Sequence, residues 1–415
     1  MERYDVVVIG SGALGASSAF HLARAGQRVA LVDKAEIGSQ TSPRAAGMSG
    51  QLRRNPVMID LARRSVEKFV GFTEETGEPM VVHQPGSLSV ARIPRHAAGL
   101  ATAAERARAF GLDVEIVSVE EAHELQPFLQ TEGILAVAHT RTDMYLEPEQ
   151  VALGYARGAE RLGATLMPNT RLDGIVVEHG RVTRVVTERG ELYAPVVVDA
   201  AGGWLRRVAE LAGSRAPLVP MRHQLMITVP LEGVTTDQPS VRIIDVNVYV
   251  RPSRGGLMLG GYERSPLTID ARLLPADFRI EQLDLDLEIL RQLAEAVHEQ
   301  FPVFCDVELQ EVRGGLPTMT LDGEHIVGPA PGVEGLFLVG GCNVGGLSIS
   351  PALGEQLAAW IVDGQPTADI SHMSPDRFAS DLTEAELNLG AWKHYAMFYE
   401  PPRVRAPAER RAVAR

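Results

Sequence analysis

The chain has 415 residues, of which 45% are hydrophobic and 22% are charged. These proportions are typical of globular proteins and exclude disordered, collagen-like and coiled-coil chains. Forty Lys and Arg against 53 Asp and Glu give a formal net charge of −13, the wrong sign for a surface that follows nucleic acid phosphates.

The two cysteines, Cys305 and Cys342, are far apart and stand among apolar residues. They can build neither a disulfide framework nor a thiolate metal site, and they fit a reducing compartment. No run approaches the ~20 apolar residues of a membrane helix, and residues 6–9 are too short for a signal peptide. We therefore expect a cytoplasmic protein with no transmembrane segment, no metal and no nucleic acid partner.

The first elements predict a βαβ unit. Residues 4–9 are a short, mostly β-branched run that ends in glycine, as a buried parallel strand does. Apolar residues at helical spacing predict a helix over 13–25 that Gly26 ends, and residues 28–32 return as a strand. About thirty residues is the expected size of this motif.

Residues 10–15, Gly-Ser-Gly-Ala-Leu-Gly, match the pattern G-x-G-x-x-G between this strand and helix. An acid, Asp33, follows at the end of the second strand, which completes the dinucleotide-binding fingerprint. In that fingerprint the glycines form the turn, admit the pyrophosphate and let helix and strand pack, and the acid accepts from the ribose. The alternative is a glycine-rich turn beside a surface acid. The residues expected to bind the dinucleotide here are Gly10, Gly12, Ala13, Leu14, Gly15, Asp33 and Lys34.

Further elements follow in chain order. A helix is expected over 148–162, and short strands separated by turn residues are expected over 165–166, 174–177, 182–187 and 192–198. A buried strand over 336–339 precedes a glycine-rich turn, and Ser350 and Pro351 are expected to open a helix that runs to about Val362.

Two intervening blocks mix strands with polar helices and predict a second, inserted domain. Strands are expected over 87–91, 224–229, 247–251 and 257–261, and helices over 100–110 and 281–301. We expect one domain from residues 1–80, 146–210 and 321–400, a second from 81–145 and 211–320, and a disordered tail over 401–415.

Three more segments matter beside the first motif. They are Gly38 to Gly47, with Thr-Ser-Pro-Arg-Ala-Ala-Gly at its end; 196–204, Val-Val-Val-Asp-Ala-Ala-Gly-Gly-Trp; and 320–351. Together these segments resemble, in the same order, the D-amino-acid-oxidase-type flavoproteins, which include sarcosine oxidase, glycine oxidase and dimethylglycine dehydrogenase. The resemblance implies FAD as the cofactor and an α/β fold, with a Rossmann-like FAD-binding domain and an inserted β-rich α+β substrate domain. The further FAD contacts that it implies are Ser42, Arg44, Ala45, Ala46, Gly47, Ala201, Gly202, Trp204, Gly341, Asn343, Gly345, Gly346, Leu347 and Ser348.

The glycine-rich turn near the end of the chain has a physical reason to face a flavin. Reduction places negative charge near N1 and the C2 carbonyl, and a helix N-terminus stabilises it. Glycines at 341, 345 and 346 would let the backbone lie against the ring. The alternative is an ordinary glycine-rich loop before an ordinary helix.

Within this family, residues 45–53 and 341–346 are similar to the dimethylglycine and sarcosine dehydrogenase branch. Members with a covalent flavin attach it through a His just before Ala-Ala-Gly, where this chain has Arg44. The attachment cysteine of sarcosine oxidases is also absent, since Gly315 stands near its place. We therefore expect FAD to be bound without a covalent link.

The candidate substrate-binding and catalytic residues are His223, Tyr249, Arg251 and Arg53. Arg and Tyr are the usual ligands of a carboxylate, and Tyr249 and Arg251 share one face of a strand. His223 resembles a family position near the flavin. Each could instead be structural. Pro317 and Ser348 replace the carboxylate-binding arginine of glycine oxidases and a lysine of sarcosine oxidase, so we expect a rebuilt pocket.

The function expected is oxidation of a small secondary or tertiary amine, an N-methylated or cyclic amino acid, by hydride transfer to flavin N5. The resulting imine would be hydrolysed, which for an N-methyl group means demethylation with release of formaldehyde. The alternatives are a flavin-dependent 2-hydroxy acid oxidase or dehydrogenase, which needs a base such as His, and the FAD-binding subunit of a heteromeric amine dehydrogenase. Oxygen, a quinone and an electron-transfer protein are all open as electron acceptors.

Overall fold

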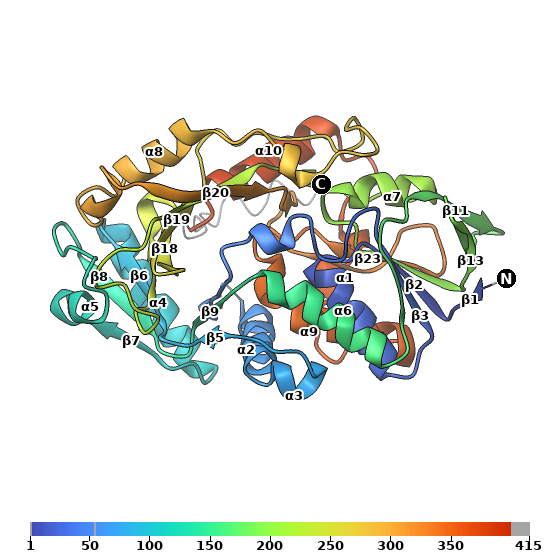
Figure 1. Cartoon of the computed structure of the whole chain (residues 1–415), viewed down its shortest axis with the longest axis horizontal. Coiled ribbons are helices and arrows are strands. Elements are labelled where there is room, and N and C mark those ends of the chain that lie inside the picture. The colour runs from blue at the N-terminus through green and yellow to red at the C-terminus, as the bar shows by residue number, and fades with distance from the viewer. Residues whose placement is uncertain (1, 54, 400–415) are drawn as a thin grey trace, which may run out of the picture.

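A computed structural model describes residues 2–53 and 55–399, so the expected tail over 401–415 lies outside the described residues. The fold is α/β, as the sequence predicts (Figure 1). In the described part of the chain, no helix has both the length and the apolar character needed to cross a bilayer.

A six-stranded sheet forms the core of the dinucleotide-binding half. Its order is β10 (Thr165–Met167), β3 (Val29–Val32), β2 (Val6–Ile9), β14 (Val196–Asp199), β23 (Leu336–Gly340) and β22 (Ile326–Pro329). All neighbours pair in parallel except β22, which is antiparallel to β23. Both faces of β2 and β3 are buried, which explains why these strands are apolar at every position.

Helices cover one face of this sheet, and Figure 1 shows α1, α6 and α9 lying together there. They are α1 (Ala13–Arg24), α6 (Glu149–Arg161) and α9 (Gly346–Asp363), with α2 (Pro56–Val70) and α3 (Phe72–Thr76) beside them. Gly354 of α9 lies against Ser17 of α1, because a Cβ at Gly354 would stand 2.3 Å from Ser17 Oγ. Close helix contact therefore fixes how α1 and α9 lie relative to each other.

The other face is covered by α7 (Leu205–Leu211) and a small sheet. That sheet has the order β1 (Glu2–Arg3), β13 (Gly190–Tyr193), β12 (Arg181–Thr187) and β11 (Leu172–Glu178). The expected meander is confirmed from β11 to β13, but the strand expected at 165–166 is not part of it, because β10 pairs with β3 in the six-stranded sheet. The single strand expected over 192–198 is wrong. It is divided at Pro195 into β13 and β14, which belong to different sheets, because proline cannot donate to a ladder.

An eight-stranded sheet forms the other half of the molecule. Its order is β20 (Leu309–Gly315), β16 (His223–Thr228), β19 (Gly256–Gly261), β18 (Val248–Ser253), β17 (Ser240–Ile243), β6 (Ser87–Ala91), β8 (Ala136–Thr140) and β7 (Val114–Val117). Only the β17 and β6 pair is parallel. The strands come from two separate stretches of the chain, 87–140 and 223–315. The assignment of domain boundaries remains a prediction.

Four helices and two short sheets complete the described fold. The helices are α4 (Pro94–Ala109), α5 (Val119–Leu125), α8 (Leu287–Glu295) and α10 (Glu384–Ala396); the sheets join β4 (Met48–Ser49), β9 (Met144–Leu146) and β5 (Val82–His83), and β15 (Val219–Pro220) and β21 (Thr318–Met319). The helix expected over 281–301 is wrong in length. Asp286 accepts from the backbone N–H of Glu288 and so begins α8 only at Leu287.

The start of α9 also differs from the expectation of a helix that begins at Pro351. The helix begins at Gly346, and Pro351 lies inside it. The N–H that proline lacks would have met the Leu347 carbonyl, and the Ser350 hydroxyl donates to that carbonyl instead, at 2.9 Å. The helix N-terminus therefore lies one turn nearer the glycine-rich loop than the sequence suggests.

Candidate functional site

One cavity of about 620 Å³ extends from the carboxyl ends of β2, β3, β14 and β23 to the eight-stranded sheet. Ligands bind at this edge of parallel sheets in general. The predicted residues that line it are Gly10, Gly12, Ala13, Leu14, Asp33, Lys34, Ser42, Arg44, Ala45, Ala46, Gly47, Arg53, Ala201, Gly202, Trp204, His223, Tyr249, Asn343, Gly345, Gly346, Leu347 and Ser348. Gly15, Gly341 and Arg251 are predicted residues that do not line it.

The first glycine-rich loop has no room for side chains. Gly10 has a φ of +97°, and a Cβ there would stand 2.5 Å from the Ala200 carbonyl oxygen. A Cβ at Gly15 would stand 1.8 Å from the Gly10 carbonyl oxygen, so Gly15 packs α1 against the loop and does not face the cavity. Gly12 lies at the N-cap of α1 and has no side chain of its own to cap the helix. The loop is thus bare backbone at a helix N-terminus, which fits a pyrophosphate.

Asp33 is held by the same loop. Its Oδ2 accepts from the Ser11 backbone N–H at 2.7 Å and from the Ser11 hydroxyl at 2.6 Å, and Oδ1 accepts from the Ala35 N–H at 2.9 Å. Burial raises the pKa of Asp33. Three of the roughly four acceptor positions of a carboxylate are occupied. The acid therefore braces the loop as well as lining the cavity, and the sequence did not reveal its contact with Ser11.

Two of the predicted side chains, Lys34 and Trp204, lie against each other in the cavity wall. Lys34 Nζ lies 3.8 Å from the centre of the Trp204 ring and donates to the Phe278 carbonyl at 3.0 Å. Burial lowers the pKa of Lys34 to about 8. The Trp204 indole N–H is buried and has no partner in the described part of the chain. Because a buried donor is costly without an acceptor, it fits an oxygen of a bound cofactor.

The loop over 38–47 supports the first loop from the other side. The Ser42 hydroxyl accepts from the Ala13 N–H at 2.9 Å. The Arg44 guanidinium donates to the carbonyls of Ser39 and Gln40 and pairs with Glu281. Arg44 therefore braces its own loop.

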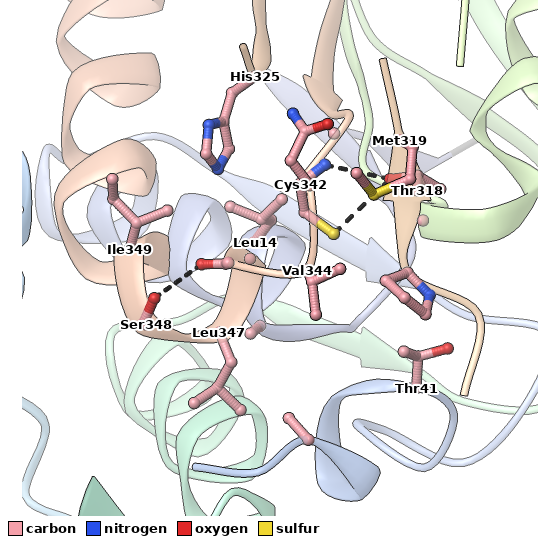
Figure 2. A pocket seen from close by; sticks show the side chains of 18 of the residues that line it. Leu14, Thr41, Thr318, Met319, His325, Cys342, Val344, Leu347, Ser348 and Ile349 are labelled. Atoms are coloured by element: carbon pink, nitrogen blue, oxygen red, sulfur yellow. Dashed lines mark hydrogen bonds between the residues drawn. The ribbon is translucent and has the colours of Figure 1, made fainter. Parts of the chain in front are cut away.

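The loop before α9 is strained and tightly held. Asn343 and Val344 have φ values of +44° and +63°, which is costly for a β-branched residue. The Asn343 amide donates to the Gly341 carbonyl at 2.7 Å, and its Oδ1 accepts from the Thr320 N–H at 3.0 Å. These bonds fix the loop, and Val344 and Leu14 of α1, both labelled in Figure 2, line the cavity. Gly341 thus shapes the turn without lining the cavity.

A chain of hydrogen bonds lies at the other end of the cavity. His223 Nδ1 lies 2.7 Å from the Tyr395 hydroxyl, and His223 Nε2 lies 3.0 Å from the Tyr249 hydroxyl. The Tyr395 hydroxyl donates to the Arg222 carbonyl at 3.2 Å, so it accepts from Nδ1–H. Nε2 is then the acceptor, and Tyr249 donates to it. Nothing in the spacing of the sequence pointed to Tyr395, which comes from α10.

Burial sets the charge of this chain of groups. It lowers the pKa of His223 to about 4 and raises that of Tyr249, so both are neutral at pH 7. The ring of Tyr249 lies across Gly260, where a Cβ would stand 2.3 Å from the hydroxyl oxygen. Glycine at this position therefore allows Tyr249 to reach His223.

Arg251 does not reach the cavity, contrary to its expected role as a substrate ligand. Its side chain is fully buried, and it donates to the carbonyls of Ala46 at 2.5 Å and Pro252 at 2.6 Å. Its guanidinium also lies 5.0 Å from the centre of the Tyr145 ring. The shared strand face with Tyr249 is as expected, but the guanidinium turns under the loop at Ala46 and supports it.

Arg53 does line the cavity, and it donates to the Ser348 hydroxyl at 3.2 Å. Burial lowers its pKa, and the nearby Arg242 guanidinium lowers it further. Arg242 and Asp143 also line the cavity. Neither carries a local signal, because Arg242 lies on β17 of the second sheet and Asp143 lies in the turn between β8 and β9, both outside the motifs.

These observations fit FAD. The bare backbone of the first loop suits a pyrophosphate, the unpartnered Trp204 N–H suits a cofactor oxygen, and the uncapped N-terminus of α9 suits the negative charge of a reduced flavin.

The comparisons with known proteins agree. A family model described as FAD dependent oxidoreductase matches residues 5–360. The chain is 31% identical to the mitochondrial sarcosine dehydrogenase of Homo sapiens over 389 residues, which are 92% of this chain and 42% of that protein. It is 26% identical over 399 residues to the 4-methylaminobutanoate oxidase (formaldehyde-forming) of Paenarthrobacter nicotinovorans, covering 95% of this chain and 48% of that protein. This chain thus spans less than half the length of these curated relatives.

Solved structures share the fold. L-proline dehydrogenase from P. horikoshii superposes with a TM-score of 0.83 at 24% identity, covering 91% of this chain and 98% of that one.

We expect Gly10→Ala to weaken FAD binding by roughly tenfold or more, because its Cβ would collide with the Ala200 carbonyl where the backbone is already left-handed. Gly26→Ala is the matched control, since its φ is +82° and nothing lies within 4 Å of a Cβ there. It should cost only about 1 kcal/mol of stability. Flavin absorbance measures the FAD affinity of both variants, and thermal melting measures their stability. Equal FAD affinity in the two would contradict the assignment of the first glycine-rich loop to FAD binding.

Proposed function

Because the chain belongs to the family of FAD-dependent oxidoreductases, we propose that it oxidises a small secondary or tertiary amine, an N-methylated or cyclic amino acid, to an imine that water hydrolyses. The observation that carries this proposal is the neutral Tyr249 and His223 pair facing the same cavity as the N-terminus of α9. The names of the relatives support it, since sarcosine and 4-methylaminobutanoate are N-methylated amino acids and one of the relatives forms formaldehyde.

Bound FAD would supply the two-electron acceptor of this reaction. The residues of the chain then have two tasks: to hold the amine in a fixed place and to favour its uncharged form, which alone has the nitrogen lone pair that oxidation requires. The guanidinium groups of Arg53 and Arg242 disfavour a further positive charge in the cavity.

Tyr249 and His223 can hold an uncharged amine in place. Tyr249 donates its own proton to Nε2 of His223, so its oxygen lone pairs are free to accept the N–H of a secondary amine. Nδ1–H stays bound to Tyr395, which leaves Nε2 as the acceptor for Tyr249. The low pKa of His223 keeps the ring neutral, so the pair adds no positive charge beside the amine.

The same pair argues against oxidation of a 2-hydroxy acid. A hydroxyl proton must be taken by a strong base, and burial makes His223 a weak one, with a pKa of about 4. The other alternative is that this chain is the FAD-binding subunit of a heteromeric dehydrogenase. In that case the chemistry at the amine would be the same, and only the electron acceptor would differ.

An anaerobic screen tests the proposed function. The holoenzyme is mixed with sarcosine, N,N-dimethylglycine, 4-methylaminobutanoate, L-proline, D-alanine and lactate, and bleaching of the flavin is followed. We expect bleaching by one or more secondary or tertiary amines and, for an N-methylated substrate, one formaldehyde per flavin reduced. Bleaching by lactate alone, or by primary amines alone, would contradict the proposal. Bleaching without turnover in air would indicate an acceptor other than oxygen.

We expect Tyr249→Phe to lower the limiting rate of flavin reduction by about 100-fold, because it removes the hydroxyl that holds the amine in place. Tyr193→Phe, on the distant β13, is the matched control and should leave the rate unchanged. Stopped-flow absorbance at saturating amine measures both rates. Equal rates in the two variants would mean that Tyr249 does not position the amine.

The pH profile of the wild type gives an independent prediction. Because burial lowers the pKa of His223 from 6.5 to about 4, the folded enzyme stays neutral at this histidine as the pH falls from 7.5 to 5. The limiting rate of flavin reduction should therefore show no acid-side ionisation near pH 6.5. An inflection near 6.5 that disappears in His223→Gln would show that the histidine is charged in that range, contrary to this account.

A further inference from the structure

A wall of aromatic rings lines the end of the cavity at the second sheet. This aromatic wall consists of His223, Tyr249, Tyr262, Phe398 and Tyr399, which all line the cavity. The ring of Tyr262 lies at its centre, and its centroid is 5.0 Å from that of His223, 4.1 Å from that of Phe398 and 5.4 Å from that of Tyr399. Neighbouring aromatic rings stabilise one another through such contacts. The aromatic wall thus continues from the second sheet to residues that follow α10.

The 396–399 segment, at and beyond the end of α10, carries two of these rings. Asn247 binds both ends of this segment. Its Nδ2 donates to the Ala396 carbonyl at 3.1 Å, and its Oδ1 accepts from the Tyr399 N–H at 2.8 Å. The backbone carbonyl of Asn247 also accepts from the Tyr262 N–H, at 2.9 Å. One residue therefore holds both the centre of the aromatic wall and the segment that completes it.

The backbone at Asn247 does not by itself require asparagine. Asn247 lies directly before β18 in the left-handed region, with φ +56° and ψ +39°. Glycine adopts this conformation at a lower cost, but it has no side chain to bind the segment. Aspartate could accept from the Tyr399 N–H but could not donate to the Ala396 carbonyl. Asparagine supplies both the donor and the acceptor.

The strand that carries Tyr262 leaves room for this contact at Gly261. A Cβ at Gly261 would stand 2.8 Å from the Asn247 carbonyl oxygen, although Gly261 has no positive φ that would require glycine. The side chain of Asn247 is also buried, since the residue is only 7% exposed. A buried amide is costly without hydrogen-bond partners, so its bonds to the 396–399 segment are part of the stable fold.

The helix α10 has anchors of its own. Leu387, Ala391 and Tyr395 are buried and pack in one cluster with Met319. The Tyr395 hydroxyl is bonded to His223 as well. Loss of the bonds from Asn247 should therefore release the 396–399 segment and leave α10 in place.

We propose that Asn247 is a positioning residue that holds the 396–399 segment against the second sheet, so that Phe398 and Tyr399 complete the wall of the amine site. Asn247 is not one of the residues that line the cavity, so it acts through the segment that it binds.

The effect on the substrate rests on the proposed function. Tyr249 holds the amine from β18, and a fixed aromatic wall keeps water out of the space beside it. Tyr249 and His223 lie on strands of the second sheet, which do not depend on the segment. Release of the segment should therefore weaken binding of the amine more than it slows oxidation of the bound amine.

Hydrogen exchange of the holoenzyme tests whether Asn247 holds the segment. Asn247→Gly keeps the left-handed turn and the carbonyl that binds Tyr262, and it removes the two side-chain bonds. We expect the amide of Tyr399 to exchange about tenfold faster or more, while the amides of 387–395 in α10 exchange as in the wild type. Unchanged exchange at Tyr399, or an equal increase along α10, would overturn the proposal.

Asn169→Gly is the matched control. Asn169 also has a left-handed backbone, with φ +49°, but it is exposed, and its amide donates to Glu36 in the other half of the molecule. Exchange at Tyr399 and binding of the amine should both be those of the wild type. A change as large as that in Asn247→Gly would refute a specific role for Asn247.

Anaerobic stopped-flow reduction tests the effect on the substrate, with sarcosine, N,N-dimethylglycine and L-proline as the amines. For an amine that reduces the wild-type flavin, we expect Asn247→Gly to raise the dissociation constant by roughly tenfold and to change the limiting rate by less than about threefold. An unchanged dissociation constant, or a loss confined to the limiting rate, would contradict the proposal. If no amine reduces the wild-type flavin, the proposed function fails, whereas hydrogen exchange still tests the hold on the segment.

A double variant shows whether Asn247 acts through the aromatic wall. Phe398→Ala removes a ring that the segment carries, and flavin absorbance establishes that each variant contains FAD. We expect the loss of amine affinity in Asn247→Gly with Phe398→Ala to be smaller than the product of the two single losses, because both changes remove the same contact. Losses that multiply would show that Asn247 acts independently of Phe398, contrary to the proposal.

Discussion

The contact between α1 and α9 is the constraint on which the site depends. At Gly354 and Ser17 the two helices are so close that an added Cβ would lie 2.3 Å from the serine hydroxyl oxygen. Each helix follows a strand of the same sheet, and β2 and β23 lie on either side of β14. Both helix N-termini therefore face one cavity, although the loops that precede them, residues 10–12 and 341–345, lie near opposite ends of the chain. Two sets of backbone N–H groups can then act on one bound anionic cofactor.

Elsewhere in the cavity, hydrogen bonds fix the backbone at one end, and burial and an ion pair set the charges at the other. The hydrogen bonds of Asn343 hold the strained turn at Val344. They stabilise the loop and so offset the free-energy cost of the left-handed backbone at Val344. At the opposite end, burial keeps His223 neutral, whereas Arg242 is held by Asp143.

Local patterns predicted the FAD-binding half well, because each depends on residues that are adjacent in sequence. Gly10 and Gly12 stand in the turn where the fingerprint requires glycine, and the meander follows its turn residues. Errors arose where long-range contacts decide the structure. The start of α9 depends on Ser350 replacing a missing proline N–H, and Arg251 was mistaken for a substrate ligand because a strand face does not say where a long side chain ends. Arg242 and Tyr395 carry no local signal, since only the register of the second sheet and the packing of α10 bring them to the cavity.

The flavin content of the purified chain tests the central claim most directly. The claim is that the two distant glycine-rich loops enclose a single FAD, held without a covalent bond because Arg44 occupies the attachment position. Absorbance of the native protein, followed by acid precipitation and identification of the released flavin, measures both parts. This account predicts one FAD per chain, all of it in the supernatant. A colourless protein that takes up no added FAD would contradict the account, and flavin retained in the precipitate would contradict the non-covalent binding.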